Sequence, residues 1–249
     1  MRGLILPLAL VLAAEVLARI FGIDSDSIAA PSAILVAGFA ALIDGTMLHA
    51  TAQTLGTALA GLAIGGGGGL AAAILLGLFP RLAQLMRFSI ETVRSIPAVA
   101  IIPVAMLVFG FGYRMEISIV AFACFWPVLI IGQSAVIGID PRLDEVGRVL
   151  RLNLWARVAK IVLPAALPRI FVAFRLAAGA ALIVAVTVEI ATNPLGLGYG
   201  LMLAQQTLHP DMMFAMLIWV GIVGWGFNAL LLFLQKRLFG PAALAGNAP

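Results

Sequence analysis

The sequence predicts an all-α fold, a polytopic bundle of about six helices that cross a membrane. Of the 249 residues, 63% are hydrophobic and 10% are charged, with a mean hydropathy of +1.15. A soluble domain is about half apolar and a quarter charged. Long apolar runs recur along the chain, and basic residues gather in alternate connections between them. Because a soluble core could not bury so much apolar surface, we expect lipid around this chain.

Six apolar runs are long enough to cross about 30 Å of hydrocarbon at about 1.5 Å per helical residue. They cover about 3–22, 52–79, 88–111, 116–138, 167–190 and 212–235. We expect the first run to be a span and not a cleaved signal peptide. Pro97 and Pro103 should kink the third span, and Pro127 the fourth.

The segment 28–43 is shorter, with about sixteen residues that start at Ala29-Ala30-Pro31 and end before Asp44. We expect it to lie in the membrane interface. A seventh span here would place the clusters of basic residues on opposite sides of the membrane, against their general preference for the cytoplasmic side.

Basic residues are concentrated on one side of the six-span topology. With the N-terminus in the cytoplasm, eleven of the 15 Lys and Arg residues fall on the inner side, six of them between 142 and 169. The outer connections carry Asp24, Asp26, Asp44 and Asp211 instead. This positive-inside pattern predicts that both termini are cytoplasmic. It also explains the net charge of +4 without a nucleic-acid partner.

The histidines and the cysteine give no indication of a metal centre. His49 and His209 lie on outer connections, and Cys124, the single cysteine, lies inside an apolar run. A lone cysteine forms no intrachain disulfide. We therefore expect neither a metal nor a cofactor in this chain.

The longest inner connection, from Asp140 to about Pro168, has the pattern of a short amphipathic helix. Its apolar residues Leu143, Val146, Val149 and Leu150 recur at spacings of three and four. Acidic Asp144 and Glu145 come first and arginines follow, the order that the helix dipole favours. The helix could rest on the inner leaflet or dock onto a cytoplasmic partner, and the pattern alone leaves both open.

This connection resembles the conserved cytoplasmic loop of binding-protein-dependent ABC importer permeases. The family pattern reads E-A-A, three residues, G, nine residues and I-x-L-P. Here Glu145-Val146-Gly147 and Ile161-Val162-Leu163-Pro164 keep that spacing. Arg151 stands where the family has glycine, which normally permits a tight turn.

Further motifs, in family order, resemble the permeases for nitrate, sulfonates, taurine and bicarbonate. The resemblance covers about residues 45–237. It rests on Arg94-Ser95-Ile96-Pro97 with Ile102-Pro103, Phe109-Gly110-Phe111-Gly112, Phe125-Trp126-Pro127-Val128, 163–168, Phe174-Arg175 and Leu195-Gly196-Leu197-Gly198-Tyr199.

The resemblance implies a type I ABC importer permease fold in the bacterial inner membrane. It divides the chain into a first helix with a periplasmic interfacial segment at 1–44, a permease core at 45–237 and a tail at 238–249. The implied ATPase-coupling loop contains Asp144, Glu145, Val146, Gly147, Arg148, Leu150, Arg151, Ile161, Leu163 and Pro164.

The implied partners are cytoplasmic ATPase subunits, a periplasmic solute-binding protein and a second permease copy that completes a homodimer. The implied solute is a small anion such as nitrate, a sulfonate or taurine, or a related small molecule. A P-loop would read G-x-x-x-x-G-K-[ST], and the run Gly65 to Gly69 has no Lys or Ser/Thr after it. We therefore expect this chain to be no enzyme, and Gly61 and Gly65 to serve close helix packing.

Polar residues within the apolar runs are candidates for the translocation pathway or its gate, because intramembrane charges face the bundle interior or a water-filled cavity. Structural ion pairs and helix-packing contacts are the alternative role. The candidates are Glu91, Arg94, Gln133, Arg175, Glu189 and Asn193. Glu91 can pair with Arg94 or with Arg87 on the same helix.

Three other functions fit the sequence less well. A secondary active transporter without an ATPase would usually show internal repeats and more spans. An intramembrane serine protease could use Ser134 and His209, but the predicted topology puts these near opposite membrane faces, whereas nucleophile and base must be hydrogen-bonded. A non-transporting membrane scaffold is the third alternative.

Overall fold

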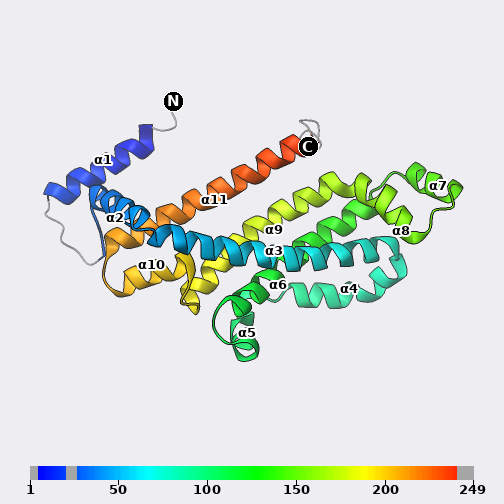
Figure 1. The fold of residues 1–249 in the computed structure, drawn as a ribbon, viewed down its shortest axis with the longest axis horizontal. Helices are drawn as coiled ribbons and strands as arrows, with labels where there is room; N and C mark the ends of the chain where they lie inside the picture. The colour runs from blue at the N-terminus through cyan, green and yellow to red at the C-terminus, as the bar shows by residue number, and fades with distance from the viewer. Residues whose placement is uncertain (1–4, 21–26, 240–249) are drawn as a thin grey trace. The chain divides into compact units, whose positions relative to one another are not determined.

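The computed structural model describes residues 5–20 and 27–239 and shows helices and no β-strand in these ranges (Figure 1). The α-helices are α1 (Ile5–Ile20), α2 (Pro31–Ile43), α3 (Thr46–Leu78), α4 (Pro80–Arg94), α5 (Ile102–Phe109), α6 (Tyr113–Ile137), α7 (Pro141–Val149), α8 (Leu154–Arg157), α9 (Leu163–Ala191), α10 (Gly196–Gln206) and α11 (Pro210–Phe239). A 3₁₀ helix, η2 (Ala98–Ile101), precedes α5, and a π-helical segment, η3 (Val158–Val162), precedes α9.

The chain forms two compact units. Unit 1 comprises Met1–Gly56 and Val186–Trp225, and unit 2 comprises Thr57–Ala185 and Gly226–Pro249. The long helices α3, α9 and α11 each contribute to both units. The three sequence regions 1–44, 45–237 and 238–249 remain a prediction.

Four helical runs among the described residues are long and apolar enough to cross a membrane. They are Thr46–Leu78, Tyr113–Ile137, Leu154–Gln206 and Pro210–Leu238. They coincide to within one residue at the C-terminal end with the predicted second and fourth spans, and they contain the predicted fifth and sixth spans. The predicted first span matches α1 over its described 16 residues, and its ends lie outside the described residues. Helix α2 has 13 residues, or about 20 Å, which is too short to cross alone.

The predicted third span at 88–111, which was expected to be kinked, is a broken pair of helices in the structure. Helix α4 ends at Arg94, and the following η2–α5 segment turns away from it by 82°. Pro97 lies between the two helices, lacks an N–H and keeps Ile96 out of the helical region. The sequence predicted a kink here, and the structure shows a full break.

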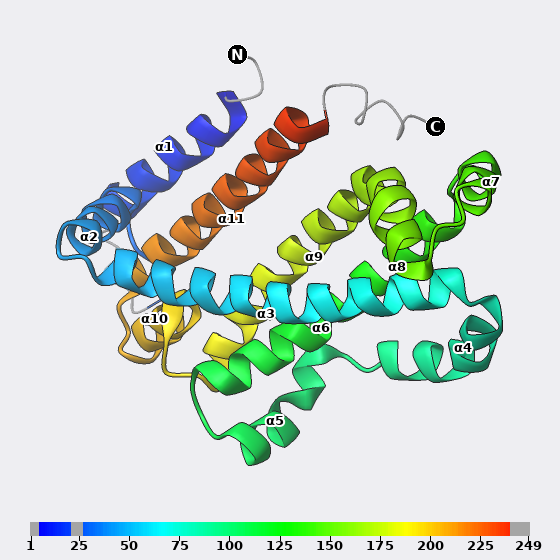
Figure 2. The same cartoon turned by 45° about the vertical axis from the view of Figure 1, so that its right-hand side comes forward.

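Unit 2 is built on close contact between α3 and α6. Along the α3 part of unit 2, Gly61, Gly65 and Gly69 are buried, whereas Gly67 is exposed. A Cβ on Gly65 would lie 2.0 Å from the backbone oxygen of Ala121 in α6. The glycine run thus serves helix packing, as the sequence predicted. Helix α4 folds back beside the C-terminal part of α3 (Figure 2).

The cores of both units consist of small and apolar side chains. In unit 2, residues of α3, α6 and α9 such as Ala58, Cys124 and Ala181 are buried together. In unit 1, Met47 of α3, Leu197 of α10 and Met216 of α11 form a second cluster. Many other apolar side chains stay exposed on the chain, as expected for a protein surrounded by lipid.

Candidate functional site

The predicted amphipathic helix of the inner connection is α7, which begins at Pro141, three residues after Gly138, the C-cap of α6. Asp140 starts it: its Oδ1 accepts a hydrogen bond from the Arg142 amide at 2.9 Å. Pro141 follows as the first helical residue, where its missing N–H has no helical partner to lose. Asp144, Glu145, Val146, Gly147 and Arg148 all lie in α7, so the structure confirms the helix that the spacing predicted.

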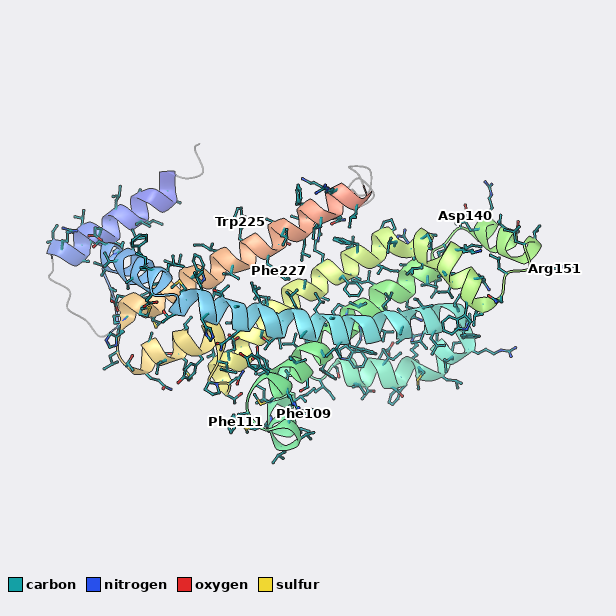
Figure 3. The ribbon with its side chains drawn as sticks, in the orientation of Figure 1. Phe109, Phe111, Asp140, Arg151, Trp225 and Phe227 are labelled. Atoms are coloured by element: carbon teal, nitrogen blue, oxygen red, sulfur yellow. The ribbon has the colours of Figure 1, made fainter. Side chains whose placement is uncertain are left out.

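The turn after α7 keeps the shape of a glycine turn although Arg151 occupies it. Arg151 has φ of 48°, in the left-handed region, and the amide of Leu150 before it still donates to the Val146 carbonyl at 3.0 Å. The Leu152 amide donates to the Gly147 carbonyl at 3.1 Å, which is the long hydrogen bond of a Schellman motif. Figure 3 shows Asp140 and Arg151 at the two ends of α7.

The two halves of the loop motif contact each other at Gly147 and Ile161. A Cβ on Gly147 would lie 3.0 Å from Ile161 Cδ1, so only a very small residue fits there without displacing Ile161. Ile161 belongs to η3, in which the Leu163 amide donates to the Val158 carbonyl in π-helical fashion. Pro164 lacks an N–H, which removes the α-helical partner of the Lys160 carbonyl and accounts for the wider turn.

The solvent-exposed face of this loop is apolar. Val149 is 81% exposed and Trp155 of α8 is 82% exposed, and Val146 and Leu150 are also exposed. Exposed apolar side chains on a helix with a charged remainder are typical of a docking or membrane-surface helix. The structure therefore shows the exposed apolar face that α7 would need either to dock onto a cytoplasmic partner or to rest on the inner leaflet.

Three candidate pathway residues, Glu91, Arg94 and Gln133, line one pocket of unit 2. We call it the polar pocket; its lining residues are Ala83, Gln84, Arg87, Ile90, Glu91, Arg94, Ile130 and Gln133. Its volume is about 330 Å³. Glu91 pairs with Arg87 and not with Arg94, through an Nε–Oε1 distance of 3.1 Å. Sequence reasoning did not name Gln84 as a member of this group.

Arg175, a fourth candidate, has a side-chain partner inside unit 2. Its Nη1 donates to Oε1 of Gln235 in α11 at 3.0 Å. Gln235 is buried and Arg175 is half-buried. This bond ties α9 to α11, so Arg175 has a structural contact whether or not it also faces the pathway.

Glu189 and Asn193 lie buried in unit 1, where α9 meets α10. Glu189 is 1% exposed. Its Oε1 accepts from the Thr54 hydroxyl at 2.7 Å and its Oε2 from the Gly198 amide at 2.8 Å. The Thr54 hydroxyl in turn accepts from the Leu197 amide at 2.9 Å. These bonds satisfy the first amides of α10, and the carboxylate suits the positive end of its dipole.

Gly196 explains why the Leu195-Gly196-Leu197-Gly198 motif contains glycines. Its φ is 82°, and a Cβ there would lie 1.9 Å from Glu189 Oε1. Its amide donates to Gln53 Oε1 at 3.0 Å. The start of α10 can therefore approach the carboxylate only without side chains at these positions.

A buried carboxylate that the sequence analysis missed is Glu116 in the first turn of α6. It is 0% exposed, and its Oε1 accepts a hydrogen bond from the Thr57 hydroxyl of α3. Its position at the edge of the predicted fourth span concealed its burial. In the sequence, the only indication of a partner for Glu116 was Thr57, near the start of the predicted second span.

Both histidines line a cavity of about 700 Å³ in unit 1, together with Asp44 and Tyr199. The hydroxyl and the amide of Thr46 hold the pKa of Asp44 below its usual value. Ser134, the nucleophile of the protease alternative, donates to the Ile130 carbonyl in its own helix at 3.0 Å. His209 Nδ1 lies 3.1 Å from Thr207 Oγ1.

Comparison with known proteins matches residues 65–239 to the family described as "binding-protein-dependent transport system inner membrane component". The putative aliphatic sulfonates transport permease protein SsuC of Bacillus subtilis is 29% identical over 238 residues, which cover 96% of this chain and 86% of SsuC. The nitrate import permease protein NrtB of Leptolyngbya laminosa is 28% identical over 170 residues, 68% of this chain and 61% of NrtB.

A third relative is the bicarbonate transport system permease protein CmpB of Synechococcus elongatus, 29% identical over 169 residues, 68% of this chain and 61% of CmpB. Among solved structures, an amino acid ABC transporter crystallised with histidines has a TM-score of 0.64 at 18% identity and covers 80% of this chain and 98% of its own. The MetNI methionine ABC transporter in an inward-facing form has a TM-score of 0.59 at 19% identity, covering 72% and 91%. The similarity to these two structures shows a shared fold.

Proposed function

Since this chain belongs to the family of binding-protein-dependent transport system inner membrane components and is the permease subunit of an ABC importer, we propose that α7 and its turn at Arg151 dock onto a cytoplasmic ATPase subunit. ATP-driven movement of that subunit would then reach the membrane helices through α7. The energy would come from the partner, because this chain has no P-loop sequence.

The observation that carries the proposal is the apolar outer face of α7 and α8, defined by Val146, Val149, Leu150 and Trp155. These side chains are exposed, whereas Gly147 of the same helix is buried close to Ile161 of η3. A rigid helix with an open apolar face can transmit displacement, whereas a loosely attached helix would absorb it. An apolar face of this kind fits a groove on a partner protein.

The full transporter in this proposal has two permease copies, two ATPases and a periplasmic solute-binding protein. A homodimer is favoured because one chain with about six spans is small for an alternating-access pore. Both termini and α7 lie in the cytoplasm, as the distribution of basic residues indicates. The solute is a small anion, because three relatives are named for aliphatic sulfonates, nitrate and bicarbonate.

Co-purification tests the docking. The full chain is expressed with the ATPase encoded beside its gene, and the ATPase that is retained on the tagged permease is quantified. Glu145→Arg and Val149→Glu should each reduce retention at least about tenfold. Changing a side chain at the centre of an interface costs about 1–3 kcal/mol or more of binding free energy, and about 1.4 kcal/mol corresponds to a factor of ten.

Arg114→Glu is the matched control, because Arg114 is exposed but lies on the predicted outer side. It should leave retention and ATP hydrolysis unchanged. Equal retention in Glu145→Arg, Val149→Glu and the unsubstituted chain would show that α7 is not the docking element.

A further inference from the structure

We infer that the polar pocket between α4 and α6 binds a small oxyanion, with Arg94 as its principal contact. The inference rests on the proposed function, because the oxyanion would be the transported solute. It adds a place on the chain where that solute is recognised. The arguments come from the spacing, the hydrogen-bonding state, the charge and the size of this pocket.

The polar lining of the pocket is a continuous stripe along one helix. Gln84, Arg87, Glu91 and Arg94 follow one another at spacings of three, four and three, which places them on one face of α4. Gln133 of α6 faces the same pocket. Met86 and Val93 of α4 instead line a separate apolar pocket with Trp126. The two faces of α4 are therefore chemically distinct.

The pocket contains more hydrogen-bond donors than acceptors. Within the described residues, Arg94, Gln84 and Gln133 make no side-chain hydrogen bond and no ion pair. A guanidinium offers five N–H donors and each amide offers two. Glu91, the acidic group of the lining, already accepts from Arg87. A ligand that supplies several acceptor oxygens would complement this arrangement.

The charge of the lining is positive. Arg87 and Glu91 balance each other, which leaves the Arg94 guanidinium as the uncompensated charge. Guanidinium groups bind planar or tetrahedral oxyanions through two parallel hydrogen bonds, which lysine cannot reproduce. The pocket therefore favours an oxyanion over a cation or a neutral solute.

Size and location support a small ligand. A volume of about 330 Å³ is near the lower end of the range for ligand pockets, about 300–1,000 Å³. Arg94 is the last residue of α4, immediately before the break at Pro97. Broken membrane helices are found where backbone lines a cavity or a substrate site.

Arg94 also has a purely structural role available, because a cation in the last turn of α4 stabilises the helix dipole. Arg94→Lys separates the two roles. It keeps the charge at the helix end, so thermal stability should be retained. It removes the forked donor pair, so oxyanion affinity should fall.

The test measures the thermal unfolding midpoint of the full-length chain in lipid nanodiscs. The protein is titrated with sodium methanesulfonate, sodium nitrate or sodium bicarbonate, and sodium chloride at equal ionic strength is the reference. We expect a saturable rise in the midpoint with at least one of the three oxyanions, because a ligand that binds only the folded state raises its stability. Arg94→Gln, Arg94→Lys and Gln133→Leu should raise the half-saturating concentration at least about tenfold. Arg81→Gln should not change it, because Arg81 is an exposed arginine of the same helix outside the polar pocket.

Two results would overturn the inference: no saturable response of the unsubstituted chain to any of the three oxyanions, or the same half-saturating concentration in Arg94→Gln as in the unsubstituted chain. Either result leaves the co-purification test of α7 untouched. Conversely, normal ATPase retention in Glu145→Arg would refute the docking proposal while an Arg94-dependent oxyanion response still stood. The two failures are therefore distinguishable.

Discussion

Arg151 shows how a single residue can keep a turn that its side chain disfavours. Its left-handed φ of 48° closes the Schellman motif after α7, at a cost of about 1–2 kcal/mol for a residue with a Cβ. The turn is closed by the hydrogen bond from the Leu152 amide to the Gly147 carbonyl, and Gly147 is buried close to Ile161. Leu208, at φ of 57°, ends α10 in the same way.

We predict that Arg151→Gly stabilises the end of α7 by about 0.5–1 kcal/mol, because glycine adopts the left-handed region without strain but loses more backbone entropy on folding. Chymotryptic cleavage between 149 and 155 should slow by about two- to fivefold, since cleavage follows local opening. Arg142→Gly, in the first turn of α7, is the control and should not slow it. Equal effects of both substitutions would show that the charge, and not the backbone, is responsible.

At the scale of elements, the contact between α3 and α6 depends on which glycine of the run faces the neighbour. Gly65 meets the Ala121 backbone, whereas no atom lies within 4 Å of a Cβ built on Gly67. The two positions are two residues apart on one helix and have opposite environments. The same Gly→Ala substitution should therefore change the free energy of unfolding in opposite directions at Gly65 and Gly67.

Gly65→Ala should lower the free energy of unfolding by about 1–3 kcal/mol, because α6 backbone must move to accept the methyl group. Gly67→Ala should raise it by about 0.5–1 kcal/mol, the usual preference for alanine inside a helix. Thermal unfolding of the purified full chain in detergent measures both. Similar shifts of the same sign would contradict the packing of α3 on α6 described above.

At the scale of the whole molecule, the basic residues predict which connections face the cytoplasm. Cys124 is 0% exposed, so a membrane-impermeant maleimide should report only on an introduced cysteine. Asp44→Cys should be labelled in intact spheroplasts, and Arg142→Cys only after permeabilisation, because they lie on predicted outer and inner connections. The reverse order of labelling would invert the topology and place α7 away from the ATPase.

The sequence alone predicted the helical class, four of the membrane spans and the short helix α7, because each follows from a local property. Hydropathy over about twenty residues is enough to recognise most spans, and the spacing of Leu143, Val146, Val149 and Leu150 is enough to recognise an amphipathic helix. The family resemblance also followed from ordered local motifs, and the comparisons confirm it. Glu91, Arg94 and Gln133 were named among six pathway candidates, and the pocket that brings Gln133 of α6 together with the two α4 residues was not predicted.

Only the tertiary structure showed what the polar residues contact. The break after Arg94 depends on Pro97 in its context, and where the sequence predicted a kinked span the structure has two helices that meet at 82°. The burial of Glu189 and Glu116 depends on Thr54 and Thr57 of α3, 135 and 59 residues away. A charge in an apolar run looks the same in sequence whether it caps a helix, joins an ion pair or lines a pocket. The partner decides its role, and the partner is distant along the chain.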